Sequence, residues 1–220
     1  MKKYSFLLIA VSMLVFTSNL ANAQFRMSVG PALGLNFNIH TGSDIDEGGT
    51  GFGLLFAGQV DMSFNQNRSL GLITSIVFYD NRSGSSSQFG NYQGTNYNLD
   101  NDVSIAYFQL STLFKYRIPN VGVFFVFGPE LGFDLSADLE QEYTFPQNPT
   151  AAPQKVKSSL KNVNSRFELK MGAGYDIQLS KLITLAPQLT FGYGISDVIE
   201  DADYNILTFQ ALLTCKFNII

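Results

Sequence analysis

The chain has 220 residues, a formal net charge of −4 and only 15% charged residues, against 20 Phe and 10 Tyr. Because soluble domains average about 25% charged residues, we expect much of this protein's surface not to face water. The acidic balance and the absence of a basic cluster argue against nucleic acid as a partner. A single cysteine, Cys215, excludes a disulfide framework.

The chain begins with a pattern typical of a secretory signal peptide, residues 1–23. Lys2 and Lys3 precede an apolar stretch, and Ala21-Asn22-Ala23 matches an A-x-A cleavage site. We predict cleavage after Ala23 and one domain over residues 24–220, with 12 basic residues (14 minus Lys2 and Lys3) against 18 acidic ones. An uncleaved anchor is the alternative, but the apolar stretch is shorter than the ~20 residues that span a bilayer.

Strand-length segments with alternating apolar and polar residues follow the leader. Successive side chains of a strand point to opposite faces, so each such segment has one apolar and one polar face. We expect eight strands, at 26–39, 52–63, 70–80, 103–117, 122–135, 165–178, 182–195 and 204–219. Most are longer than the usual strand of a globular sheet and suit a tilted membrane strand, which needs about 9–11 residues.

The segment Arg166 to Leu179, RFELKMGAGYDIQL, shows the alternation most clearly. Its apolar face consists of Phe167, Leu169, Met171, Ala173, Tyr175, Ile177 and Leu179. The opposite face carries charges, amides and glycines. Only the segment 70–80 is ambiguous, because both of its faces are largely apolar.

The connections between the expected strands alternate between short and long. Asn65–Ser69, Pro119–Val121 and Ser180–Lys181 are short turns, whereas the long polar connections are 40–51, 81–102, 136–164 and 196–203. Outer-membrane barrels have short periplasmic turns and long extracellular loops. The alternation therefore predicts that both ends of the domain lie on the periplasmic side.

These patterns predict an all-β fold, an eight-stranded antiparallel up-and-down transmembrane β-barrel with a polar, plugged interior. Unpaired backbone groups are costly in hydrocarbon, so the sheet must close, and eight strands leave an interior that side chains can fill. A soluble lipocalin-like barrel is the alternative. Its outside would be charged, whereas the polar faces here are rich in Gly, Ser, Thr, Asn and Gln.

Charges of opposite sign have matching spacing on two neighbouring expected strands. One antiparallel register sets Asp134 opposite Arg166 and Glu130 opposite Lys170, with Glu168 between the two cations. Because buried charges are costly unless paired, we predict a salt-bridge network that fills the barrel. A gate or proton pathway is the alternative interpretation.

A second interior cluster is expected near the periplasmic end. It comprises Arg26, Asp61 and Lys216.

No catalytic, metal or cofactor site is predicted, although two patterns suggest chemistry. His40, with Ser43 and Asp44 nearby, could serve a lipid-modifying enzyme, but no triad signature accompanies it and a solvated loop histidine is the simpler interpretation. The acidic stretches 43–49 and 200–203 could hold Ca²⁺, yet neither matches a twelve-residue calcium loop.

Three stretches resemble the PorT-type outer-membrane β-barrel family of Bacteroidetes. They are YFQLSTLFKYRI (107–118), VFFVFGPELGFDLS (123–136) and GAGYDIQLSKLITLAPQLTFGYGISD (172–197). The resemblance implies an eight-stranded barrel in the outer membrane of a Gram-negative bacterium. One branch of that family is associated with type IX secretion. Members often end in an aromatic residue that aids insertion; here Phe217 is the candidate, since the chain ends in Ile220.

We therefore expect a non-enzymatic outer-membrane protein with a structural, adhesive or assembly role, whose partners are outer-membrane lipid and envelope or secretion proteins. Exposed loop aromatics are plausible anchors for partners. The candidates are Phe89, Tyr92, Tyr97, Tyr143 and Phe145. The alternatives are an accessory component of type IX secretion or gliding and a lipid-modifying enzyme that uses His40.

Overall fold

The computed structural model describes residues 26–42, 49–65, 67–92, 95–148, 152–200 and 202–219. The expected leader and its cleavage site lie outside these residues. No helix within the described residues is long and apolar enough to cross a bilayer.

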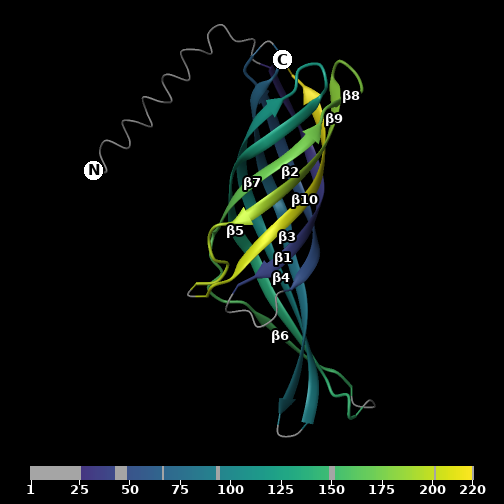
Figure 1. The fold of residues 1–220 in the computed structure, drawn as a ribbon, viewed down its shortest axis with the longest axis vertical. Helices are drawn as coiled ribbons and strands as arrows, with labels where there is room; N and C mark the ends of the chain where they lie inside the picture. Colours follow the sequence, from purple (N-terminus) through teal and green to yellow (C-terminus); the bar gives the residue numbers. More distant parts are fainter. Residues whose placement is uncertain are drawn as a thin grey trace, which may run out of the picture.

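Antiparallel strands form a closed ring, drawn in Figure 1. The strands are β1 (Arg26–Thr41), β2 (Thr50–Ser63), β3 (Leu70–Tyr92), β4 (Thr95–Arg117), β5 (Val123–Thr144), β6 (Gln154–Ser159), β7 (Arg166–Tyr175), β8 (Ile177–Gln178), β9 (Ile183–Gly194) and β10 (Asn205–Asn218). The ring runs β1-β2-β3-β4-β5-β7-β9-β10 and closes through the β10–β1 pair. The predicted eight-stranded antiparallel barrel is therefore confirmed.

Two short strands lie off this ring. β6 pairs with β5 beyond the ring, and β8 continues past β7 along β9 after a break at Asp176. In Figure 1 the short turns gather at the end where β1 starts and β10 ends, while β3, β4 and β5 project from the opposite end.

The ring has apolar side chains outside and polar side chains inside, the reverse of the distribution in a soluble protein. Large apolar side chains point outward, and Phe52 and Leu54 are 74% and 63% exposed. The interior buries polar and charged groups, such as Gln109 and Thr208. This arrangement removes apolar side chains from water only if hydrocarbon surrounds the ring, as it does for a transmembrane barrel.

Apolar and ionic groups alternate in layers along the interior. Going along β4 from the short-turn end, Lys115 belongs to an ionic cluster, Leu113 to an apolar layer with Phe124, and Tyr107 to a second apolar layer. The central charges lie between the two apolar layers. A cavity of about 30 Å³ lies beside Glu130, between the central charges and the first apolar layer. The bore is therefore filled by side chains.

A β-bulge in β3 explains why the segment 70–80 was ambiguous. The register shifts between Val77 and Asp80, so that Phe78 and Tyr79 both face outward. Before the bulge the odd-numbered residues point inward, and after it the even-numbered ones do. Asp80 and Arg82 are thereby turned into the bore.

Two segments expected to be loops are largely strands. In 81–102, β3 and β4 pair from Asn81↔Ala106 to Tyr92↔Thr95. In 136–164, β5 continues to Thr144 and β6 pairs with it. Past Ser85 in β3, before Val103 in β4 and from Ser136 in β5, these extensions lie beyond the ring, where neither face contacts hydrocarbon. Their sequences therefore lack the apolar alternation by which the membrane strands were recognised.

Candidate functional site

Six charged side chains meet in the middle of the bore. The Arg82 guanidinium lies 2.6 Å from Asp80 and 3.6 Å from both Glu130 and Glu168. Arg166 pairs with Glu168 at 2.7 Å, and Lys170 pairs with Glu130 at 2.6 Å. We call these six residues the central network; its three cations and three carboxylates cancel in charge.

Neutral polar groups on neighbouring strands complete the central network. Lys170 donates a hydrogen bond to Gln210 at 2.7 Å, and Arg166 donates to the backbone carbonyl of Ile206 at 2.7 Å. Arg82 also donates to Thr208, and Asn36 donates to Asp80. These hydrogen bonds therefore tie the ions, which come from β3, β5 and β7, to β1 and β10.

The central network differs in two respects from the predicted one. The β5–β7 register sets Glu130 opposite Glu168 and Gly132 opposite Arg166, two residues from the predicted alignment. Asp134 is exposed and does not face Arg166, because β7 begins at Arg166 and β5 has left the ring by that point. The prediction for Asp134 was wrong.

Asp80 and Arg82, the residues that the prediction missed, occupy the centre of the network. They had been assigned to a strand end and a loop. The sequence does contain a sign of them, because the in–out alternation shifts by one residue in this strand. Two neighbours, Phe78 and Tyr79, both face outward, and Asp80 and Arg82 then face inward. A bulge placed at that pair would have found them.

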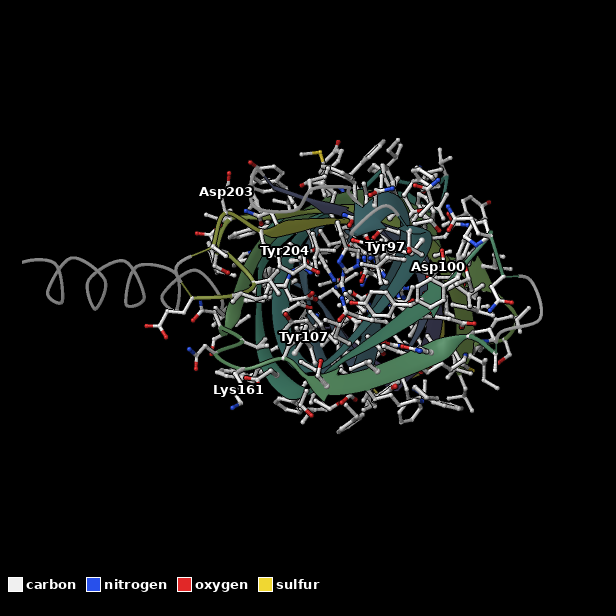
Figure 2. The ribbon with its side chains drawn as sticks, turned by 90° about the horizontal axis from the view of Figure 1, so that it is seen from below. Tyr97, Asp100, Tyr107, Lys161, Asp203 and Tyr204 are labelled. Atoms are coloured by element: carbon white, nitrogen blue, oxygen red, sulfur yellow. The ribbon has the colours of Figure 1, made fainter. Side chains whose placement is uncertain are left out.

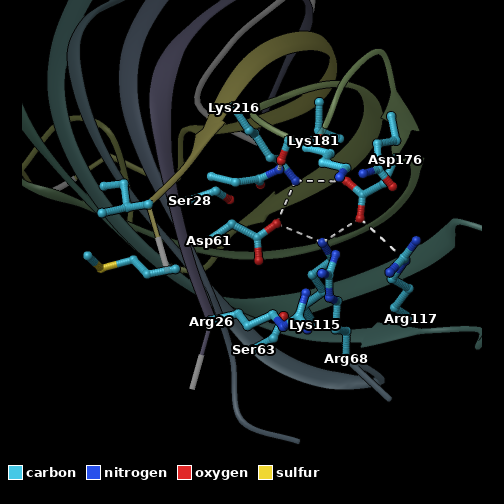
Figure 3. Close-up of a pocket in the computed structure, with 15 residues that line it drawn as sticks. Arg26, Ser28, Asp61, Ser63, Arg68, Lys115, Arg117, Asp176, Lys181 and Lys216 are labelled. Carbon is cyan, nitrogen blue, oxygen red and sulfur yellow. Dashed lines mark hydrogen bonds and ion pairs between the residues drawn. The ribbon is translucent and has the colours of Figure 1, made fainter. Parts of the chain in front are cut away.

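A second ionic cluster closes the bore at the short-turn end (Figure 3). Asp61 accepts from Lys216 at 2.5 Å and from Lys115 at 2.7 Å. Asp176 accepts from the same two ammonium groups, at 3.0 Å and 2.9 Å. The four side chains form a closed cycle of alternating charge, which we call the ion cycle. Both ammonium groups also lie over the Phe124 ring, at 4.3 and 5.1 Å from its centroid.

The ion cycle brings together two of the three residues expected at this end. Asp61 and Lys216 are joined, whereas Arg26 is exposed at the mouth and belongs to none of the ion pairs found among the described residues. Lys115 and Asp176 were missed. Asp176 interrupts the expected strand 165–178, because its N–H bonds to the Gly122 carbonyl at 2.9 Å while its side chain enters the bore.

His40 is not the solvated loop residue that was expected. β1 continues to Thr41, and the His40 ring is only 3% exposed. Its Nε2 lies 3.0 Å from the Ser83 carbonyl, to which it can donate, and its Nδ1 lies 2.5 Å from the Tyr204 hydroxyl. Both ring nitrogens therefore have protein partners. Ser43 and Asp44 lie outside the described residues.

The strands that leave the ring form a projecting sheet, which we define as 86–92, 95–102, 136–144 and β6. In it Phe89 is 69% exposed, and the rings of Tyr97 and Tyr143 lie 5.9 Å apart. Phe145, just past β5, is half-buried, and Tyr92 ends β3. Figure 2, viewed into this end, shows Tyr107 and Tyr204 pointing into the ring.

Ion pairs connect β6 to β5 in the projecting sheet. Lys157 lies 2.7 Å from Glu140, and Lys155 lies 2.8 Å from Glu142. The Lys157 ammonium, by its hydrogen bond, holds the pKa of the Glu140 carboxyl below its usual value. The Glu142 carboxylate likewise raises the pKa of Lys155. These are solvent-exposed pairs, which contribute little to stability.

Groups of His, Cys, Asp or Glu able to hold a metal ion were sought in the described part of the chain, and none was found. Most of the acidic stretch 43–49 and one residue of 200–203 lie outside that part. Calcium binding there stays a prediction.

Comparison with known families identifies the fold. The family profile described as "Outer membrane protein beta-barrel domain" matches residues 18–200, well over half of the chain. The chain belongs to this family. A search of curated proteins gave no match.

Several solved barrels are similar to this outer-membrane barrel. Ail, the attachment invasion locus protein of Yersinia pestis, is 15% identical over 87% of this chain and 98% of its own (TM-score 0.39). Neisserial surface protein A is 12% identical over 87% and 97% (TM-score 0.42). A major outer membrane protein of Thermus thermophilus is 12% identical over 89% and 100% (TM-score 0.47).

Membership in this family gives the two ends of the barrel different surroundings. In outer-membrane barrels the short turns lie on the periplasmic side and the long connections outside the cell. By this rule we expect the ion cycle at the periplasmic mouth and the projecting sheet outside the cell. The central network is buried between them, where it can hold the strands together but cannot reach a ligand in solution.

Proposed function

We propose that this protein is a non-enzymatic, non-conducting outer-membrane barrel that acts in adhesion through its projecting sheet. The observation that carries the proposal is the length of three strands. β3, β4 and β5 have 23, 23 and 22 residues, whereas β1, β2, β9 and β10 have 12 to 16. Seven to nine residues of each lie in the projecting sheet, and at 3.3 Å per residue they reach roughly 25 Å beyond the ring.

The projecting sheet offers contact groups and unpaired edges. Phe89 and Val156 are exposed on it, at 69% and 49%. Among the described residues, β3 pairs with β2 only as far as Ser85, and β6 pairs only with β5. Open edges can receive a strand from another protein, and exposed aromatic residues are frequent anchors at interfaces. A surface of this kind suits contact with another cell or an envelope protein.

The filled bore supports a role without transport. The central network and the apolar layer around Phe124 place buried side chains across the bore, and the cavity described between them has a volume of about 30 Å³. We expect the protein in a planar bilayer to show no steady ion conductance. A stable open channel would contradict this part of the proposal.

Shortening the tip of the projecting sheet tests the adhesive role. Residues 88–99 would be replaced by Asn-Gly, which closes a two-residue hairpin and keeps the Ser87↔Asp100 pair. Cells carrying this variant should lose attachment to other cells, while the amount of the barrel at the cell surface is unchanged. Val121→Ser, in an exposed turn at the other end, is the control. Undiminished attachment of the shortened variant would refute the proposal.

The enzymatic alternative rests on His40 alone. Engagement of both ring nitrogens by Tyr204 and Ser83 favours a structural role for this histidine. The test is the lipid profile of the outer membrane. A change on deletion of the protein that His40→Ala reproduces would support the enzyme and contradict our proposal.

A narrower assignment, to the PorT-type branch and to type IX secretion, rests on the segments 107–118, 123–136 and 172–197. Co-purification with secretion proteins would support it. Normal secretion in a deletion strain would exclude it without affecting the adhesive role.

A further inference from the structure

We propose that the periplasmic mouth of the barrel binds a phosphate-bearing ligand. The mouth is a cavity of about 260 Å³ whose floor is the ion cycle. Six cationic side chains line it against two carboxylates, so its formal charge is +4 (6 − 2) among the described residues. The six are Arg26, Arg68, Lys115, Arg117, Lys181 and Lys216.

The excess positive charge lies at the rim. Lys115 and Lys216 are neutralised by Asp61 and Asp176 in the ion cycle, and Arg117 reaches Asp176 only at 3.5 Å. The remaining rim cations come from the start of β1 and from two turns, and no ion pair joins them to any described residue. They are Arg26, Arg68 and Lys181 (Figure 3).

One of these cations lies at an unusual backbone position of its turn. Arg68 has φ of 53°, a conformation that favours Gly or Asn. Its turn is already fixed by Asn65, whose side-chain oxygen accepts from the Ser69 N–H at 2.8 Å. The turn is therefore held by Asn65, and the Arg68 side chain lines the mouth.

The size and charge of the mouth favour phosphate over a single carboxylate. A phosphate group carries about −1.5 to −2 charges in one compact group, so one or two such groups match an excess of +4. Arginine forks bind phosphate oxygens in a bidentate way. The buried ammonium groups of the floor are already held over Phe124, so the floor would not have to rearrange when a phosphate group binds. Such a group could belong to a soluble periplasmic molecule or to a lipid headgroup at the inner rim of the bilayer.

Calorimetric titration of the full-length folded protein with inorganic pyrophosphate, in zwitterionic detergent, tests the proposal. Replacing the rim cations together (Arg26→Gln, Arg68→Gln, Lys181→Gln) should weaken binding at least about tenfold, because charge-assisted contacts are lost. The matched control removes the same charge at the other end (Lys155→Gln, Lys157→Gln, Lys161→Gln) and should bind like the unmodified protein. If the triple rim variant does not fold, Lys181→Gln alone should still weaken binding measurably.

Three results would overturn the proposal: no binding of pyrophosphate by the unmodified protein, equal loss in the rim and control variants, or tighter binding of tetraglutamate than of pyrophosphate. A second arm distinguishes the sources of the phosphate. In nanodiscs, competition by added phosphatidic acid assigns the mouth to a headgroup, and binding of pyrophosphate without such competition assigns it to a soluble molecule. Neither arm depends on adhesion, so the two proposals fail separately.

Discussion

The two ionic clusters inside the barrel contain similar groups but differ in how completely protein surrounds them. The central network balances three cations with three carboxylates between two apolar layers. The ion cycle balances Lys115 and Lys216 with Asp61 and Asp176, but it opens into the periplasmic mouth. Charged groups that protein surrounds on every side can only stabilise the barrel. Charged groups that face an open mouth can also bind a ligand.

Removing the central cation should have the largest effect. Arg82→Met leaves Asp80, Glu130 and Glu168 with two cations in the buried interior. Breaking a buried ion pair from one side costs about 3–5 kcal/mol. Urea unfolding of the protein folded into lipid vesicles should show a loss of that order.

Lys161→Met is the control for Arg82→Met, because Lys161 is exposed beyond the ring. We expect its effect to stay within about 0.5 kcal/mol. Equal losses in the two variants would show that the central network contributes nothing special.

The ion cycle should be less sensitive. Asp61→Asn removes one negative charge, but Asp176 still bridges Lys115 and Lys216, and water at the mouth can solvate them. We expect a loss of about 1–3 kcal/mol in the same unfolding measurement. Arg26→Gln, at the same mouth but without an ion pair to the described residues, should change little. A loss from Asp61→Asn larger than that from Arg82→Met would reverse the comparison.

A glycine that faces the central network offers a test without removing a charge. A Cβ at Gly192 would lie 1.4 Å from the Glu168 carboxylate oxygen. Gly192→Ala should therefore displace Glu168 from Arg166 and destabilise the barrel by about 1–2 kcal/mol. The control is Gly58→Ala, where the nearest atom, on Phe78, would be 3.5 Å away. Equal stability of both variants would mean that Glu168 can move freely.

The ring itself could be predicted from the sequence because lipid imposes a strict rule on it. Every residue from Phe167 to Tyr175 obeys the alternation, since one face must be apolar in hydrocarbon and the other must fill the bore. The interior pairings could be predicted only in part. A bulge at Phe78-Tyr79 and the departure of β5 from the ring depend on neighbouring strands, and together they brought Arg82 in and left Asp134 out.

The projecting sheet was missed for the opposite reason. Beyond the ring both faces contact water, so residues such as Ser87 and Asp100 carry no apolar period. What holds them is pairing, as in the hydrogen bond of 2.5 Å between these two side chains. Backbone hydrogen bonding between polar segments requires no particular order of residue types, so the sequence pattern does not predict it.

The smallest expected effect concerns the exposed ion pairs that connect β6 to β5. The pKa of Glu140 is lowered in the folded state, chiefly by the hydrogen bond from Lys157. A depressed carboxyl pKa stabilises the pairing above the ordinary pKa near 4.5, and this contribution is lost as the pH falls through the lower folded value. NMR titration of the Val156 amide in nanodiscs should therefore give a midpoint below 4.5. Lys157→Gln should move that midpoint upward. The control, Lys161→Gln, changes a residue past β6 and should leave the midpoint unchanged. An unchanged midpoint in Lys157→Gln would show that the ion pair between Lys157 and Glu140 does not form in solution.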